Sequence, residues 1–129
     1  MEDAAAGSVS WIAVIVGAVV SFLVGWFWYS PKGFGTKWAE GVGVSLQDAS
    51  KMPPQAMVIQ FLGMLFMSWV IGLTAASNAL FTAILVILAI ACLIVANGYF
   101  AQKSQYSINV EGGFIVICGV IMIVCQGIF

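Results

Sequence analysis

The sequence has 129 residues, of which 63% are hydrophobic and 7% are charged, with four Lys or Arg and five Asp or Glu. A soluble domain carries roughly a quarter charged residues, so these charges are too few to cover a small water-soluble globule. The net charge of −1 offers no basic surface for nucleic acid, and no nucleic-acid partner is expected. The composition excludes an ordinary soluble enzyme and predicts an integral membrane protein.

Four stretches are long and apolar enough to cross a bilayer as helices, which takes about 20 residues each. They run from about 9–30, 55–76, 79–100 and 107–128. The alternation of apolar and polar residues that marks membrane strands is missing from all four. The sequence therefore predicts an all-α fold in which residues 1–129 form a single domain of four transmembrane helices. Ser77-Asn78 joins the second and third stretches in an antiparallel hairpin.

The lysines predict the orientation of this domain. Lys32, Lys37 and Lys51 lie between the first two stretches and Lys103 lies between the last two, so all of them face one side. Cytoplasmic loops of membrane proteins carry the excess of Lys and Arg, which places both chain termini on the non-cytoplasmic side. The N-terminus has no positive residue before the first stretch, unlike a signal peptide, so that stretch is expected to be retained.

The cytoplasmic loop 31–54 is the one long connection. Three apolar side chains recur in it at helical spacing: Phe34, Trp38 and Val42. This spacing predicts a short interfacial helix with Trp38 at the level of the lipid headgroups. Ser45-Leu46-Gln47-Asp48 predicts a further helix start, because a capping Ser is followed three residues later by an acid.

Small residues fall at every fourth position of the first stretch, at Ala13, Gly17, Ser21 and Gly25. In lipid, helices associate through close packing, and small residues at this spacing allow close approach. We expect this stripe to be a packed helix face. The neighbour that covers it can belong to the same chain or to a partner protein.

Glu111 is the one carboxylate expected at membrane depth, at the start of the last stretch. It can be an interfacial acid favoured by the helix dipole, or a carboxylate that binds a proton or ion. Four other polar residues have a similar depth at the lysine-bearing end: Tyr29, Gln60, Asn97 and Asn109. They can converge on Glu111 as a hydrogen-bonded cluster, or each can satisfy its own helix end or helix contact.

Several chemistries are not expected. The sequence contains no histidine, which removes the commonest ligand of haem, copper and zinc. The three cysteines lie inside apolar runs, where they are expected to behave as small hydrophobic side chains: Cys92, Cys118 and Cys125. No nucleophile–base pair is visible. We therefore expect no catalytic residue, no metal site and no cofactor, and the chain is not expected to be an enzyme.

The run Trp28-Tyr29-Ser30-Pro31-Lys32-Gly33-Phe34-Gly35-Thr36-Lys37-Trp38 resembles the signature W-Y-S-P-x-x-F-G-x-x-W of a family of small bacterial membrane proteins, known as domain of unknown function 1761. The resemblance extends over nearly the whole chain. The last helix of that family tends to read Asn-x-Gly-Tyr-His, whereas here Asn109 matches but the aromatic residue and the histidine do not. The resemblance implies a four-helix fold in the bacterial cytoplasmic membrane and supplies no activity.

Three functions fit these observations. The favoured one is an accessory subunit of a larger membrane protein assembly, with lipids and other membrane subunits as partners. The partner subunit would pack on the Ala13–Gly25 stripe or on Trp26-Phe27-Trp28. The alternative is a small proton-coupled transporter that acts as an oligomer, with Glu111 as its coupling carboxylate. A membrane-embedded enzyme fits least, because it needs catalytic groups that the sequence does not show.

Overall fold

The computed structural model describes residues 9–43 and 54–129, in which all regular structure is helical. Its helices are α2 (Trp11–Trp28), α3 (Gly35–Val42), α4 (Pro54–Ala76), α5 (Leu80–Phe100) and α6 (Gln105–Ile128). Four of them are long and apolar enough to cross a membrane, and α3 is the short helix between the first two. The predicted fold class is confirmed.

Serine caps set two of the helix starts. The Ser10 side chain accepts a hydrogen bond from the Ala13 amide, so α2 begins at Trp11, two residues after the predicted boundary. The Ser104 side chain caps α6 in the same way, and α6 therefore begins two residues before the predicted boundary. The predicted helix start at Ser45–Asp48 lies outside the described residues.

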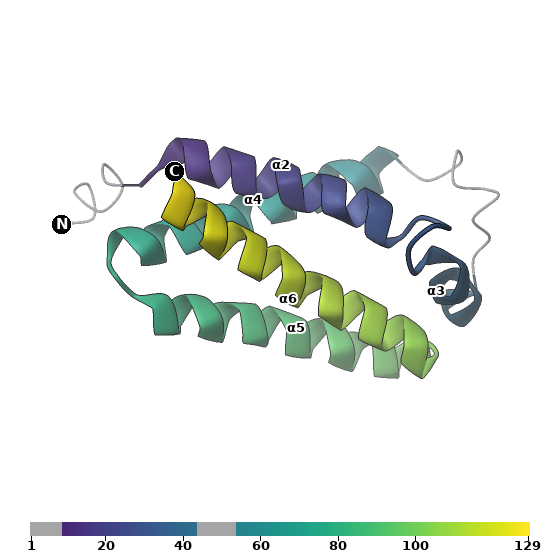
Figure 1. Ribbon diagram of the computed structural model, residues 1–129. Coiled ribbons are helices and arrows are strands. Elements are labelled where there is room, and N and C mark those ends of the chain that lie inside the picture. Colours follow the sequence, from purple (N-terminus) through teal and green to yellow (C-terminus); the bar gives the residue numbers. More distant parts are fainter. Residues whose placement is uncertain (1–8, 44–53) are drawn as a thin grey trace.

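The last helix, α6, lies at the centre of the bundle (Figure 1). It packs against α2, α5, α3 and α4, while α2 also packs on α4. In the most apolar stretch of α6, half of the residues are buried, whereas 17% are buried in the corresponding stretch of α5. The helices α4 and α5 share a short turn but run apart from it in Figure 1, and they pack against each other less closely than α5 packs on α6.

Small residues bring the neighbouring helices close to α6. A Cβ atom built on Gly119 would overlap the Ile87 side chain of α5, and one on Gly112 would lie 2.7 Å from Val95 Cγ2. On the other side, a Cβ on Gly25 of α2 would lie 2.7 Å from Phe114 Cζ. These approaches are too close for any larger residue, so the glycines set the spacing of the helices around α6.

The predicted small-residue stripe of α2 packs within the chain. Ala13, Gly17 and Ser21 are buried and Gly25 is half-buried. A Cβ on Gly17 would lie 2.8 Å from Ser68 Oγ, and that hydroxyl donates a buried 2.7 Å hydrogen bond to the carbonyl oxygen of Val14. The stripe is thus covered by α4 and α6 of the same chain, which is one of the two alternatives that the sequence leaves open.

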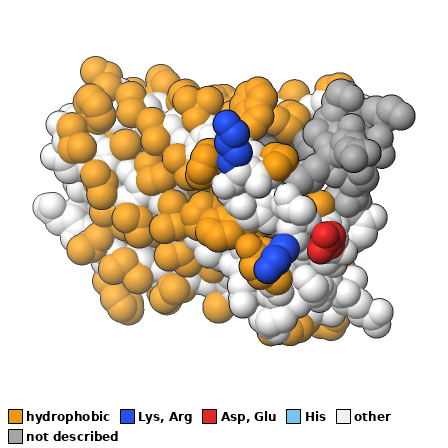
Figure 2. Space-filling model, turned by 45° about the vertical axis from the view of Figure 1, so that its right-hand side comes forward, with side chains coloured by type: hydrophobic (Ala, Val, Ile, Leu, Met, Phe, Trp, Pro, Cys, Tyr) orange, Lys and Arg blue, Asp and Glu red, His pale blue; other side chains and the backbone are white. Residues whose placement is uncertain are grey.

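Apolar side chains cover much of the face shown in Figure 2. Trp26 and Phe27, at the end of α2, are 68% and 61% exposed. The outer face of α5 carries further large apolar side chains, among them Phe81, Leu93 and Phe100, at 75%, 71% and 88%. Such a surface is stable only when lipid or another membrane protein covers it.

Candidate functional site

A compact turn joins α2 to α3. The Phe34 amide donates to the carbonyl oxygen of Trp28 at 2.9 Å, and the Gly35 amide donates to that of Ser30, also at 2.9 Å. A Cβ on Gly35 would overlap the carbonyl oxygen of Tyr29, so only glycine fits at this position. The turn places α3 directly beside the first turns of α6.

Aromatic residues fix the end of α2 against α6. The indole nitrogen of Trp28 donates to the carbonyl oxygen of Val110 at 3.0 Å. The Tyr29 ring contacts the rings of Trp38 and Phe114, with centroid distances of 4.9 Å and 5.4 Å. Burial raises the pKa of the Tyr29 hydroxyl above its ordinary value, and the negative charge of Glu111 raises it further.

The helix α3 docks on the N-terminal end of α6 through its backbone. The Ser104 amide donates to the carbonyl oxygen of Gly41 at 3.1 Å, and the Ser107 hydroxyl donates to that of Trp38 at 2.8 Å. A Cβ on Gly41 would overlap both serine hydroxyls. On the outer side, Lys37 Nζ lies 5.6 Å from the centroid of the Tyr106 ring.

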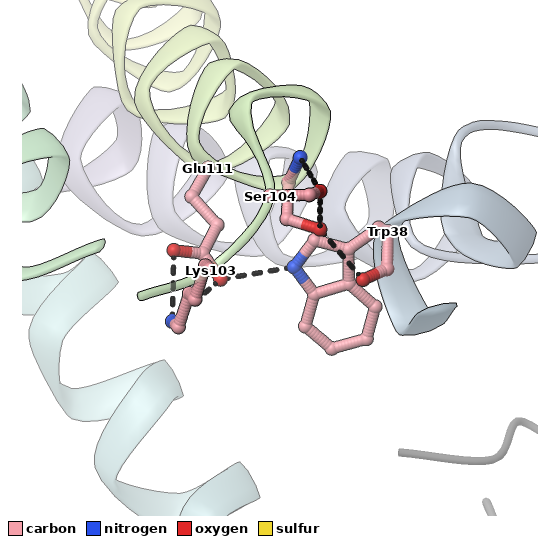
Figure 3. A network of polar contacts seen from close by, with 5 residues as sticks. Trp38, Lys103, Ser104 and Glu111 are labelled. Carbon is pink, nitrogen blue, oxygen red and sulfur yellow. Dashed lines mark hydrogen bonds and ion pairs between the residues drawn. The ribbon is translucent and has the colours of Figure 1, made fainter. Parts of the chain in front are cut away.

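Glu111 lies at the centre of this contact, in a group that we name the Glu111 cluster: Trp38, Lys103, Ser104, Ser107 and Glu111 (Figure 3). Lys103 Nζ lies 3.0 Å from Glu111 Oε1 and 2.9 Å from Oε2. The Trp38 indole nitrogen donates to Oε2 at 2.9 Å. The side chains of Lys103 and Glu111 are 21% and 14% exposed, so the ion pair is largely shielded from solvent.

Trp38, which the spacing in the loop predicts at the level of the lipid headgroups, is half-buried in this cluster. Its indole N–H donates to Glu111 and its ring packs on Tyr29. The indole ring needs both an apolar contact and an acceptor for its N–H, and the protein supplies both.

The structure brings together only part of the predicted polar cluster. Tyr29 is linked to Glu111 indirectly, because its ring packs on Trp38 and the Trp38 indole N–H donates to Glu111. Asn109 is exposed and accepts a 2.9 Å hydrogen bond from Gln105, whose own side chain accepts from the Tyr99 hydroxyl at 2.8 Å. Asn109 therefore belongs to a separate polar chain on the outside of the bundle.

Gln60 and Asn97 are also exposed, on α4 and α5. Within residues 9–43 and 54–129, their side chains make no hydrogen bond. Each side chain lies on the outer surface of its helix, and neither joins the hydrogen bonds around Glu111.

The partners of Glu111, Lys103 and Trp38, were not predicted from the sequence. Two signals point to them. Charged groups at membrane depth pair with one another, and Lys103 is the lysine nearest to Glu111 along the chain. A buried tryptophan needs an acceptor for its N–H, and Glu111 is the acceptor at that end of the bundle.

The polar groups of the cluster satisfy one another through hydrogen bonds and the ion pair. Among the described residues, no three His, Cys, Asp or Glu side chains gather where they could hold a metal ion.

Fold and site define a multi-pass helical membrane protein in which a short docked helix closes one end of the bundle. The family model described as "Protein of unknown function (DUF1761)" matches residues 12–127, and the chain belongs to this family, as the resemblance implied. No curated protein and no solved structure matches the chain.

Proposed function

We propose that this chain is an accessory subunit of a larger membrane protein assembly in the bacterial cytoplasmic membrane, with its lysine-bearing end in the cytoplasm. The observation that carries the proposal is the exposure of two amide side chains, Gln60 and Asn97, on membrane-spanning helices. Lipid tails offer an amide no hydrogen-bond partner, whereas a neighbouring helix can.

Gln60 lies on a face of α4 that has room for the close approach of a second helix. It is six residues into α4, about 9 Å along the helix axis from Pro54. Gly63 lies three residues later on the same face, and nothing lies within 4 Å of a Cβ built on it. A glycine beside an amide lets a second backbone approach and form interhelical hydrogen bonds.

The helix α5 has a comparable surface at the same end of the bundle. Asn97 lies three residues before its end, and because α4 and α5 are antiparallel, it has a depth similar to that of Gln60. The exposed face of α5 also carries the small residues Ala89 and Cys92. Both amides are exposed, and neither side chain forms a hydrogen bond with another described residue. We expect partner transmembrane helices to cover these surfaces.

The geometry favours this role over proton-coupled transport. A coupling carboxylate must exchange its proton with each side of the membrane in turn. Both oxygens of Glu111 are instead engaged by Lys103 and one also by Trp38, which suits a fixed structural contact.

The test is migration on a native gel after gentle solubilisation. The wild-type chain should migrate in an assembly much larger than a small homo-oligomer, and Gly63→Leu should release it because leucine blocks the approach of the partner helix. The matched control is Thr82→Leu, which also adds bulk at an exposed position, but near the other end of the bundle. A wild-type chain that migrates only as a small homo-oligomer would contradict the proposal, as would an unchanged assembly in Gly63→Leu.

A further inference from the structure

An open cavity of about 300 Å³ lies between α4, α5 and α6 at the hairpin end, away from the Glu111 cluster. Three alanines and a glycine line it, at Ala75, Ala79, Ala83 and Gly127. Larger side chains at these positions would fill the space. The volume lies at the lower end of the range for sites that bind small organic ligands.

The lining changes from polar to apolar with depth. Asn78 lies in the turn between α4 and α5, and Gln126 lies two residues before the end of α6, so both are at the mouth. Ile71, Ala83 and Ile123 line the deeper part. Ile71 is five residues before the end of α4, which places it about 8 Å farther into the membrane. A phospholipid has the same order of polarity from its ester groups to its acyl chains.

Gln126 provides a hydrogen-bond donor without an acceptor. Its Nε2 atom is buried, has no hydrogen-bond partner among the described residues, and lies 3.2 Å from a Cβ built on Gly72 of α4. The Gln126 side chain also lines the cavity, so a change of its rotamer can present the N–H group to a ligand there. An unpaired buried amide gains when a ligand brings an acceptor.

We propose that this cavity binds one membrane phospholipid, with an ester carbonyl that accepts a hydrogen bond from the Gln126 amide and an acyl chain against Ile71, Ala83 and Ile123. The headgroup lies beside Asn78 in the turn. This site is separate from the surfaces around Gln60 and Asn97, which lie toward the other end of α4 and α5.

Native mass spectrometry of the full-length chain tests the site, after delipidation in mild detergent and addition of dioleoyl phosphatidylglycerol. The wild-type chain should retain one lipid. Gln126→Leu keeps the shape of the side chain but loses the donor, and should lower retention about fivefold. Ala75→Phe adds bulk at an exposed position of the lining and should abolish retention without disturbing the buried core.

The control is Val20→Phe, at an exposed position of α2 outside the cavity, which should retain lipid as the wild-type chain does. Equal retention in all variants would show non-specific lipid and overturn the proposal. So would a wild-type chain that retains no lipid, or one that selects a neutral isoprenoid quinone over the phospholipid when both are offered.

Discussion

Glu111 is held at the edge of an apolar helix by two donors from different parts of the chain. Moving a carboxylate out of water costs several kcal/mol even after the protein relaxes. Lys103, just before α6, and Trp38, on α3, offset this cost by contacts of 2.9 to 3.0 Å. The same contacts tie α3 to α6, so the charge specifies how the elements dock.

A double-mutant cycle measures this ion pair. Glu111→Gln and Lys103→Met should each lower the free energy of unfolding by about 1–3 kcal/mol, because each leaves a partly buried charge without its partner. The double variant should lose less than the sum, by about 1–2 kcal/mol. Unfolding in mixed micelles, followed by tryptophan fluorescence, gives these values. Glu40→Gln changes an exposed carboxylate of α3 and should shift stability by less than about 0.5 kcal/mol. Additive losses in the double variant would show that the pair contributes nothing.

At the scale of single helices, the stability of α3 depends on its contacts with the rest of the protein. It has eight residues, too few for a helix that is stable on its own in water. The spacing of Phe34, Trp38 and Val42 predicts such a helix, and the structure has it at Gly35–Val42. Its docking was not predicted, because the contact uses the Gly41 backbone, and close backbone approach leaves no periodic pattern in the sequence.

Gly41→Ala should release α3 from α6. The added methyl group would overlap the hydroxyls of Ser104 and Ser107, and overpacking of this kind costs about 1–3 kcal/mol. Tryptic cleavage after Lys37, an exposed residue of α3, should then be about tenfold faster, because cleavage follows the population of the undocked state. Thr36→Ala, at an exposed position of the same helix, should leave the rate unchanged. If Gly41→Ala is cleaved no faster than the wild-type chain, the contact does not hold α3.

The stripe on α2 and the amides of α4 and α5 show that the sequence does not predict which helices meet or how each helix is rotated. The spacing from Ala13 to Gly25 predicts a close contact but not which helix makes it, and in the structure the neighbours are α4 and α6 of the same chain. The depth of Gln60 and Asn97 follows from their positions along the helices. Their outward direction does not, because packing around α6 sets the rotation of each helix.

Over the whole molecule, the two ends of the bundle differ in charge. Figure 2 shows charged side chains gathered toward one end and apolar side chains over the rest of that face. Lys32 and Lys37 lie on or beside α3, which docks at the start of α6 directly after Lys103, so these three lysines share one end. The opposite end carries the turn at Asn78, the end of α6 and the cavity. This asymmetry, which the order of lysines along the sequence already implied, is the feature that orients a helical membrane protein.

Reporter fusions test that orientation in a bacterial host. Alkaline phosphatase is active only outside the cytoplasm, so fusion after Phe129 should give activity and fusion after Lys103 should give none, with a fluorescent protein fused at the same two positions showing the reverse. Because positive charge near the helix ends sets the orientation, changing Lys32, Lys37 and Lys103 together to Gln should produce both orientations and measurable phosphatase activity from the Lys103 position. Phosphatase activity at that position in the unmodified chain would place the lysine-bearing end outside and would also remove the Glu111 cluster from the cytoplasmic side.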